Sequence, residues 1–169
     1  CFWAYVFRRE AFDGVQFDET MTYDSELKVL IGILDKYKRF IMLNEKLNYD
    51  YADENDYFNF QPQFDKEWYM GVMDSFFIDA VKEGDSRFKQ RAVLYMIVCR
   101  YACNMNERDK SVLSPSEAQE FIDKTGEALK NIDDVIISDN LLNNVSRAPK
   151  FFALNLLRMK YKDDKLMPS

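Results

Sequence analysis

The stretch RFKQRAVLYMIVCRYACN, residues 87–104, decides the fold of this chain. Apolar residues lie on nearly all sides of a helix drawn through it, and such a helix is buried inside a protein. Gln90, Arg100 and Asn104 are polar residues within this pattern. Because a buried polar group needs hydrogen-bond partners, we expect these three to form a network between helices rather than a ligand site.

Further helices are predicted on both sides of this stretch. Apolar residues at helical spacing mark an amphipathic helix from about residue 23 to residue 37. Similar patterns predict helices at about 65–82, 114–132, 135–143 and 149–161. The helix at 114–132 has the most specific start, because Ser114, Pro115 and Glu117 have the spacing of a capping box.

Short strands are expected only near the N-terminus. Residues 2–8 resemble one strand and residues 39–51 resemble one or two, while Asp13-Gly14 is a strong turn signal. We therefore predict a mainly α protein, in which a small α/β piece, residues 1–60, precedes a helical domain, residues 62–169.

Composition excludes several classes of function. The chain has 169 residues, a net charge of −6 and no histidine. An acidic surface repels phosphate backbones, so a nucleic-acid partner is not expected. Without histidine, Ser-His and Cys-His nucleophilic pairs and histidine metal sites are excluded. The sequence contains no run of 18 apolar residues, so no membrane span is predicted. The chain begins at Cys1 in an apolar stretch, which suggests a fragment of a longer protein.

The cysteines indicate a reducing compartment. Cys99 and Cys103 are four residues apart in one predicted helix, where side chains rarely reach disulfide geometry. Buried, reduced thiols and a cytoplasmic location are therefore expected.

The N-terminal third carries a resemblance to a known family. The stretch AYVFRREAFDGVQFDETMTYDSELKVLIGILDKYKRFIMLNEKLNYDY, residues 4–51, resembles the end of the catalytic domain of family 2 glycosyltransferases, which have the GT-A fold. The helical remainder resembles accessory domains of bacterial members, chiefly through FDKEWYMGVMDSFF and QRAVLYMIVCRYACNMNERDKSVL. The matching positions before the helix are Phe7-Arg8-Arg9-Glu10, Gly14, Phe17-Asp18-Glu19 and Tyr23.

This resemblance implies a catalytic carboxylate at the start of the helix at 23–37. In the family a Glu-Asp pair supplies the base that deprotonates the acceptor hydroxyl. With Tyr23 aligned, Ser25 takes the Glu position and Glu26 takes the Asp position. Three alternatives remain open: Glu26 is the base, Asp24 takes that role through a one-residue slip, or the site is inactive. From the residues alone, Asp24, Ser25 and Glu26 are equally consistent with helix capping.

The resemblance also suggests substrate-binding residues. Tyr49 and Tyr51 retain part of a segment that lies near the donor phosphates in related enzymes. Trp68 and Tyr69 either line an acceptor groove or fix their helix against the N-terminal piece. No metal ligand is expected in this fragment, whereas the full-length enzyme is expected to hold Mg²⁺ or Mn²⁺ through an upstream Asp-x-Asp motif.

Residues 147–162, RAPKFFALNLLRMKYK, combine an apolar pattern with five basic residues and no acid. Such a helix packs on the bundle, docks onto another domain or lies on an anionic membrane surface.

Together these features suggest the C-terminal fragment of a glycosyltransferase, inactive alone, that moves a sugar from a nucleotide-sugar to a cell-surface polysaccharide or teichoic-acid-like acceptor. The expected partners are the upstream catalytic half, the nucleotide-sugar and the glycan acceptor. The location would be cytoplasmic, including the inner face of the membrane. The alternative is a non-catalytic helical protein-interaction module.

Overall fold

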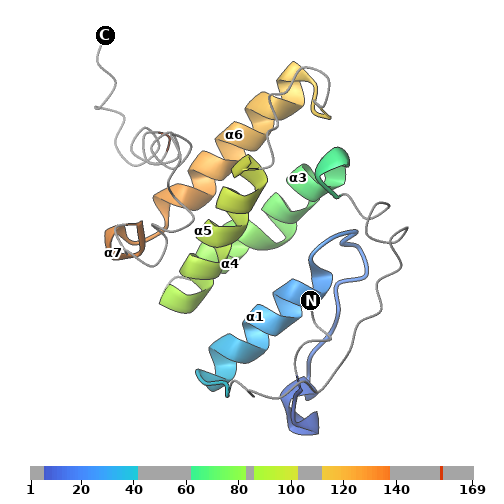
Figure 1. The fold of residues 1–169 in the computed structure, drawn as a ribbon, viewed down its shortest axis with the longest axis vertical. Coiled ribbons are helices and arrows are strands. Elements are labelled where there is room, and N and C mark those ends of the chain that lie inside the picture. The colour runs from blue at the N-terminus through green and yellow to red at the C-terminus, as the bar shows by residue number, and fades with distance from the viewer. Residues whose placement is uncertain (1–5, 42–61, 83–85, 103–111, 138–156, 158–169) are drawn as a thin grey trace.

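The computed structural model of this chain describes residues 6–41, 62–82, 86–102, 112–137 and 157. Their regular secondary structure is entirely helical, so the prediction of a mainly α protein is confirmed (Figure 1). The elements in chain order are η2 (Arg9–Phe12), α1 (Ser25–Tyr37), η3 (Pro62–Phe64), α3 (Lys66–Val72), η4 (Met73–Phe77), α4 (Ile78–Lys82), α5 (Arg87–Ala102), α6 (Pro115–Lys130) and α7 (Asp134–Ile137).

Helix α5 lies at the centre of the helical group, as its apolar sequence predicts. Val93, Leu94 and Ile97 are completely buried. Helix α4 contacts both α5 and α6, and α1 also contacts α5. The main hydrophobic cluster therefore draws on every long helix of the described chain, including α1 through Ile31.

Elements α3, η4 and α4 follow one another without a break. Asp65 begins this helical run, because its side chain accepts a hydrogen bond from the Glu67 amide. The middle segment, η4, is a π-helix in which the Ile78 amide bonds to the Met73 carbonyl. Met73, Phe76 and Phe77 within it are buried, so the wider turn directs large side chains into the core.

Helix α1 is apolar on two sides. Ile31 joins the main cluster, whereas Val29 and Ile33 pack on Ala11 of η2 in a second, smaller cluster. Between η2 and α1, the predicted turn is present, with Gly14 at a φ of 76°. Helix α1 is thus held between the η2 segment and the helical group.

The predicted strands are not found in the described residues. Residues 6–8 and 39–41 are the described parts of the two predicted strand segments, and neither forms a strand. Val6, Phe40 and Ile41 are strongly exposed there, so no neighbouring strand covers them within the described chain. The strand prediction is wrong at these positions. The rest of both segments, like most of the helix predicted at 149–161, lies outside the described residues.

Candidate active site at the start of helix α1

Glu26 lies in the first turn of α1, where the helix dipole stabilises a negative charge. The residue is exposed. Within the part of the chain that the structure describes, no hydrogen bond or ion pair is found for its carboxylate. Glu26 is therefore an accessible carboxylate on a well-defined helical turn.

Asp24 has a different environment, although it is only two residues away. It precedes α1 with φ 64° and ψ 12°, in the left-handed region, and its side chain makes no capping hydrogen bond. Instead, Oδ2 of Asp24 accepts from Nη2 of Arg100 at 2.5 Å. The expectation that the Asp24 side chain caps the helix is wrong, because a cation from α5 binds this carboxylate.

Arg100 is almost completely enclosed by protein. Its side chain is 2% exposed, compared with 21% for the Asp24 side chain. Its Nε donates to the Trp68 carbonyl at 2.8 Å, and its Nη1 donates to the Met96 carbonyl at 3.3 Å. Its guanidinium carbon lies 4.6 Å from the ring centre of Trp68 and 4.9 Å from that of Phe77. Burial lowers the pKa of Arg100, and the Asp24 carboxylate opposes this shift.

A second contact joins the start of α1 to the start of α3. The Tyr23 hydroxyl donates to Oδ2 of Asp65 at 2.8 Å, while Oδ1 of Asp65 accepts from the Glu67 amide at 2.9 Å. These two hydrogen bonds, that of the amide first, lower the pKa of Asp65. The carboxylate of Asp65 thus caps α3 and orients Tyr23 at the same time.

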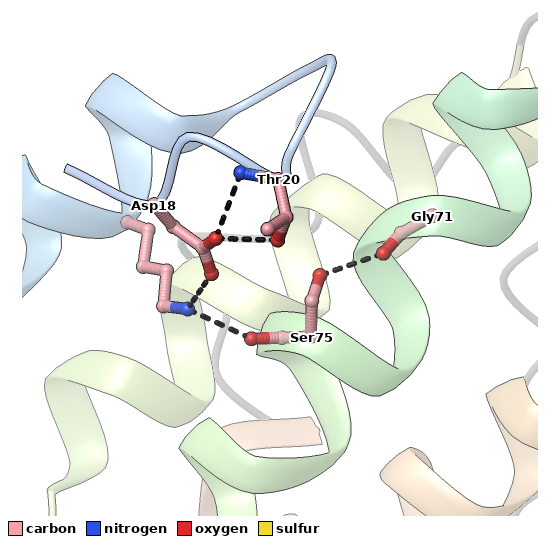
Figure 2. Close-up of polar contacts among 5 residues, drawn as sticks. Asp18, Thr20, Gly71 and Ser75 are labelled. Carbon is pink, nitrogen blue, oxygen red and sulfur yellow. Dashed lines mark hydrogen bonds and ion pairs between the residues drawn. The ribbon is translucent and has the colours of Figure 1, made fainter.

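A third contact lies one turn further along α1 (Figure 2). Nζ of Lys28 donates to Oδ2 of Asp18 at 2.8 Å and to the carbonyl of Ser75, in η4, at 3.0 Å. Oδ1 of Asp18 also accepts from the Thr20 amide at 3.2 Å and from its hydroxyl at 2.6 Å. The bond from Lys28, followed by those from Thr20, lowers the pKa of Asp18 to about 2. Lys28 therefore joins the preceding loop to the π-helical segment.

Trp68 and Tyr69 lie at the first turn of α3. The ring of Trp68 is half-buried and packs on Arg100. Tyr69 is 1% exposed, and its hydroxyl donates to the Gln63 carbonyl at 3.0 Å. This contact of Trp68 is with α5, so it tests neither the acceptor-groove interpretation nor the fixing of α3 to the N-terminal piece. The ring of Tyr69 is enclosed and packs edge-on against Phe121. Tyr49 and Tyr51 lie outside the described residues.

The predicted polar network of α5 is present at two of its three positions. Arg100 makes the contacts given above, and Oε1 of Gln90 accepts from the Asp133 amide at 2.8 Å, next to α7. Asn104 lies outside the described residues. The sequence indicated that Arg100 needs a partner, but Asp24 is 76 positions away and is one of 29 acidic residues. Cys99 is a free thiol, as expected, but it is only partly buried, whereas the sequence predicts a buried thiol. Cys103 lies outside the described residues.

A hollow of about 200 Å³ lies between α1 and the η2 segment. Ala11 and Val15 line it from the η2 side, and Lys28, Gly32 and Lys36 line it from α1. Glu26 is not among its lining residues, so the accessible carboxylate does not face this hollow.

Two further features bear on the expected chemistry. Among the described residues, no group of three or more His, Cys, Asp or Glu side chains is arranged to hold a metal ion, so we assign no metal ligand here. None of the described helices is both long enough and apolar enough to cross a membrane.

Comparison of the chain with protein-family models, with curated proteins and with solved structures gives no significant match.

Proposed function

We propose that this chain is the C-terminal part of a family 2 glycosyltransferase that transfers a sugar from a nucleotide-sugar to a cell-surface polysaccharide or teichoic-acid-like acceptor. The observation that carries the proposal is the contrast between two neighbouring carboxylates. Glu26 is accessible, whereas Asp24 is bound to Arg100. The accessible carboxylate is the one that aligns with the base of the family that this sequence resembles.

The environment of Asp24 argues against its being the base. Oδ2 of Asp24 is bound to Nη2 of the buried Arg100 at 2.5 Å, so this oxygen is not available to an acceptor hydroxyl. Breaking the contact would also leave the Arg100 guanidinium buried without its carboxylate partner. Glu26 has neither restriction among the described residues, so we assign the base to Glu26.

In the proposed reaction, Glu26 takes the proton of the acceptor hydroxyl as that oxygen bonds to the anomeric carbon and the nucleoside diphosphate leaves. General-base catalysis of this kind contributes roughly 10²–10⁴-fold to the rate. The divalent cation expected for the family would neutralise the leaving diphosphate, and its ligands are assigned to the upstream catalytic half. We further propose a cytoplasmic location, because the donor is a nucleotide-sugar.

The helical region would hold the turn that carries Glu26. Three contacts join the N-terminal piece to it: Asp24 with Arg100, Tyr23 with Asp65, and Lys28 with Ser75. They come from α5, from the cap of α3 and from η4, so they approach the start of α1 from three elements. Placement matters, because a displacement of about 1 Å can cost on the order of 10²-fold in rate.

The test is Glu26→Gln in the native-length protein, assayed for sugar transfer. We expect kcat to fall by roughly 10²–10⁴-fold with KM little changed, since the amide retains the shape of the side chain and loses the base. Glu67→Gln is the matched control, because Glu67 is an exposed glutamate in the first turn of α3. Near wild-type transfer by Glu26→Gln would contradict the assignment. If no sugar transfer is detected for the native-length protein, the non-catalytic interaction module is favoured.

A further inference from the structure

Arg100 is a buried cation at an unusual place. It belongs to the central helix α5, yet its charged group reaches the residue immediately before α1. Leaving a buried charge unpaired is strongly destabilising, so the buried Arg100 depends on this contact more than the partly exposed Asp24 does. This arrangement indicates that Arg100 has a role at the start of α1.

The backbone conformation of Asp24 indicates what this role is. A left-handed backbone is uncommon for a residue other than glycine, although aspartate tolerates it better than most. Asp24 adopts it without a side-chain capping bond, and the side chain is bound by Arg100 instead. The carbonyl of the same residue accepts from the Lys28 amide at 2.9 Å, which closes the first turn of α1. Glu26 lies inside that turn.

Arg100 can hold this residue firmly because its own position is fixed. Its three nitrogens donate to Asp24, Trp68 and Met96, which belong to the start of α1, to α3 and to α5 itself. The planar guanidinium makes these bonds in fixed directions, which an ammonium group cannot reproduce. Through this side chain, the positions of α3 and α5 determine where the backbone of Asp24 lies.

We infer that Arg100 is a positioning residue, which acts through Asp24 to fix the first turn of α1 and with it the direction of the Glu26 carboxylate. The role of Glu26 rests on the proposed function, whereas the fixing of the turn does not. Arg100 itself does not contact the substrate in this account.

The experiment combines two measurements on the native-length Arg100→Lys variant, which keeps the charge and loses the planar fork. The first is hydrogen exchange of the Lys28 amide, and the second is the steady-state rate of sugar transfer. We expect exchange at Lys28 to become at least about tenfold faster, because the bond to the Asp24 carbonyl opens more often. We expect kcat to fall at least about tenfold with KM changing less than about twofold.

Val93→Ala is the matched control. Val93 is completely buried on the same helix, so its truncation destabilises the core without touching Asp24. We expect this variant to leave Lys28 exchange and kcat close to wild type at a temperature where both proteins are folded. A purely structural role for Arg100 would instead make Arg100→Lys behave like Val93→Ala.

Unchanged Lys28 exchange in Arg100→Lys would overturn the inference whatever the activity. Faster exchange with unchanged kcat would also overturn it, if Glu26→Gln is inactive, because the base would then work without this positioning. If Glu26→Gln is fully active as well, the proposed function fails, and the catalytic part of the inference fails with it. Faster exchange with a lower kcat supports both.

Discussion

Helices α1 and α6 begin in different ways. At α6, Ser114 and Glu117 satisfy each other: the serine hydroxyl accepts from the Glu117 amide, and the Glu117 carboxylate accepts from the Ser114 amide at 2.8 Å. At α1, Asp24 makes no such local bond and is held by Arg100, 76 positions away. One start is encoded by four consecutive residues, and the other depends on the folded helical group.

This difference bears on function. A local N-terminal cap keeps its geometry as long as the helix exists. It therefore fixes the start of the helix independently of the rest of the protein. When the start of a helix is held by a distant helix, the orientation of its first turn is defined only in the folded protein. Glu26 lies at the start of α1, which Arg100 of α5 holds, so the position of the proposed base depends on the packing of α5.

The largest expected effect concerns the two partners of the buried ion pair. Asp24→Asn leaves a guanidinium that is 2% exposed without a counter-charge, so we expect a loss of about 3–5 kcal/mol in the free energy of unfolding. Arg100→Met leaves only a carboxylate that water can reach, so we expect a smaller loss. Urea denaturation of both variants gives the two values.

The double variant Asp24→Asn/Arg100→Met provides the check on this asymmetry. We expect it to be more stable than Asp24→Asn alone, because the unpaired buried charge has been removed. Equal losses in the two single variants, with additive effects in the double variant, would show that the pair is not held as described.

A smaller effect is expected at the local cap of α6. Ser114→Ala removes the acceptor for the Glu117 amide and should cost about 1 kcal/mol of stability. Ser114→Asp, which keeps a side-chain acceptor at this position, should remain close to wild type in thermal unfolding. If Ser114→Asp were as unstable as Ser114→Ala, the cap would not be the cause.

The smallest effect is a pH dependence at the loop before α1. The pKa of Asp18 is lowered from 3.8 to about 2 in the folded protein, so its contribution to stability is present above pH 3.8 and is lost as the pH falls through about 2. We expect Asp18→Asn to flatten the fall in stability over this range of pH. An unchanged fall in Asp18→Asn would show that Asp18 is not its source.

The same contrast explains what the sequence could predict. The box at Ser114, the turn at Gly14 and the burial of α5 follow from residues close together in the chain, and all three are confirmed. The need of Arg100 for partners was also predictable from its apolar surroundings. The identity of its carboxylate was not, because any of many acids could be brought near it by folding.

Two further features escaped prediction for physical reasons. The π-helical segment Met73–Phe77 keeps apolar residues on its inner side, so its sequence resembles an ordinary helix. The sequence of residues 39–41 resembles a strand, yet these residues do not form one and Phe40 and Ile41 are exposed in the structure.

The role of Arg100 at the start of α1 can be tested by comparing two equivalent amides. The Lys28 amide donates to Asp24 and the Ala118 amide donates to Ser114, each closing the first turn of its helix, at 2.9 and 2.8 Å. Hydrogen exchange should become faster at Lys28 but not at Ala118 in Arg100→Met, and at Ala118 but not at Lys28 in Ser114→Ala. If Arg100→Met instead left Lys28 exchange unchanged, or accelerated both amides equally, the start of α1 would not be held specifically by Arg100.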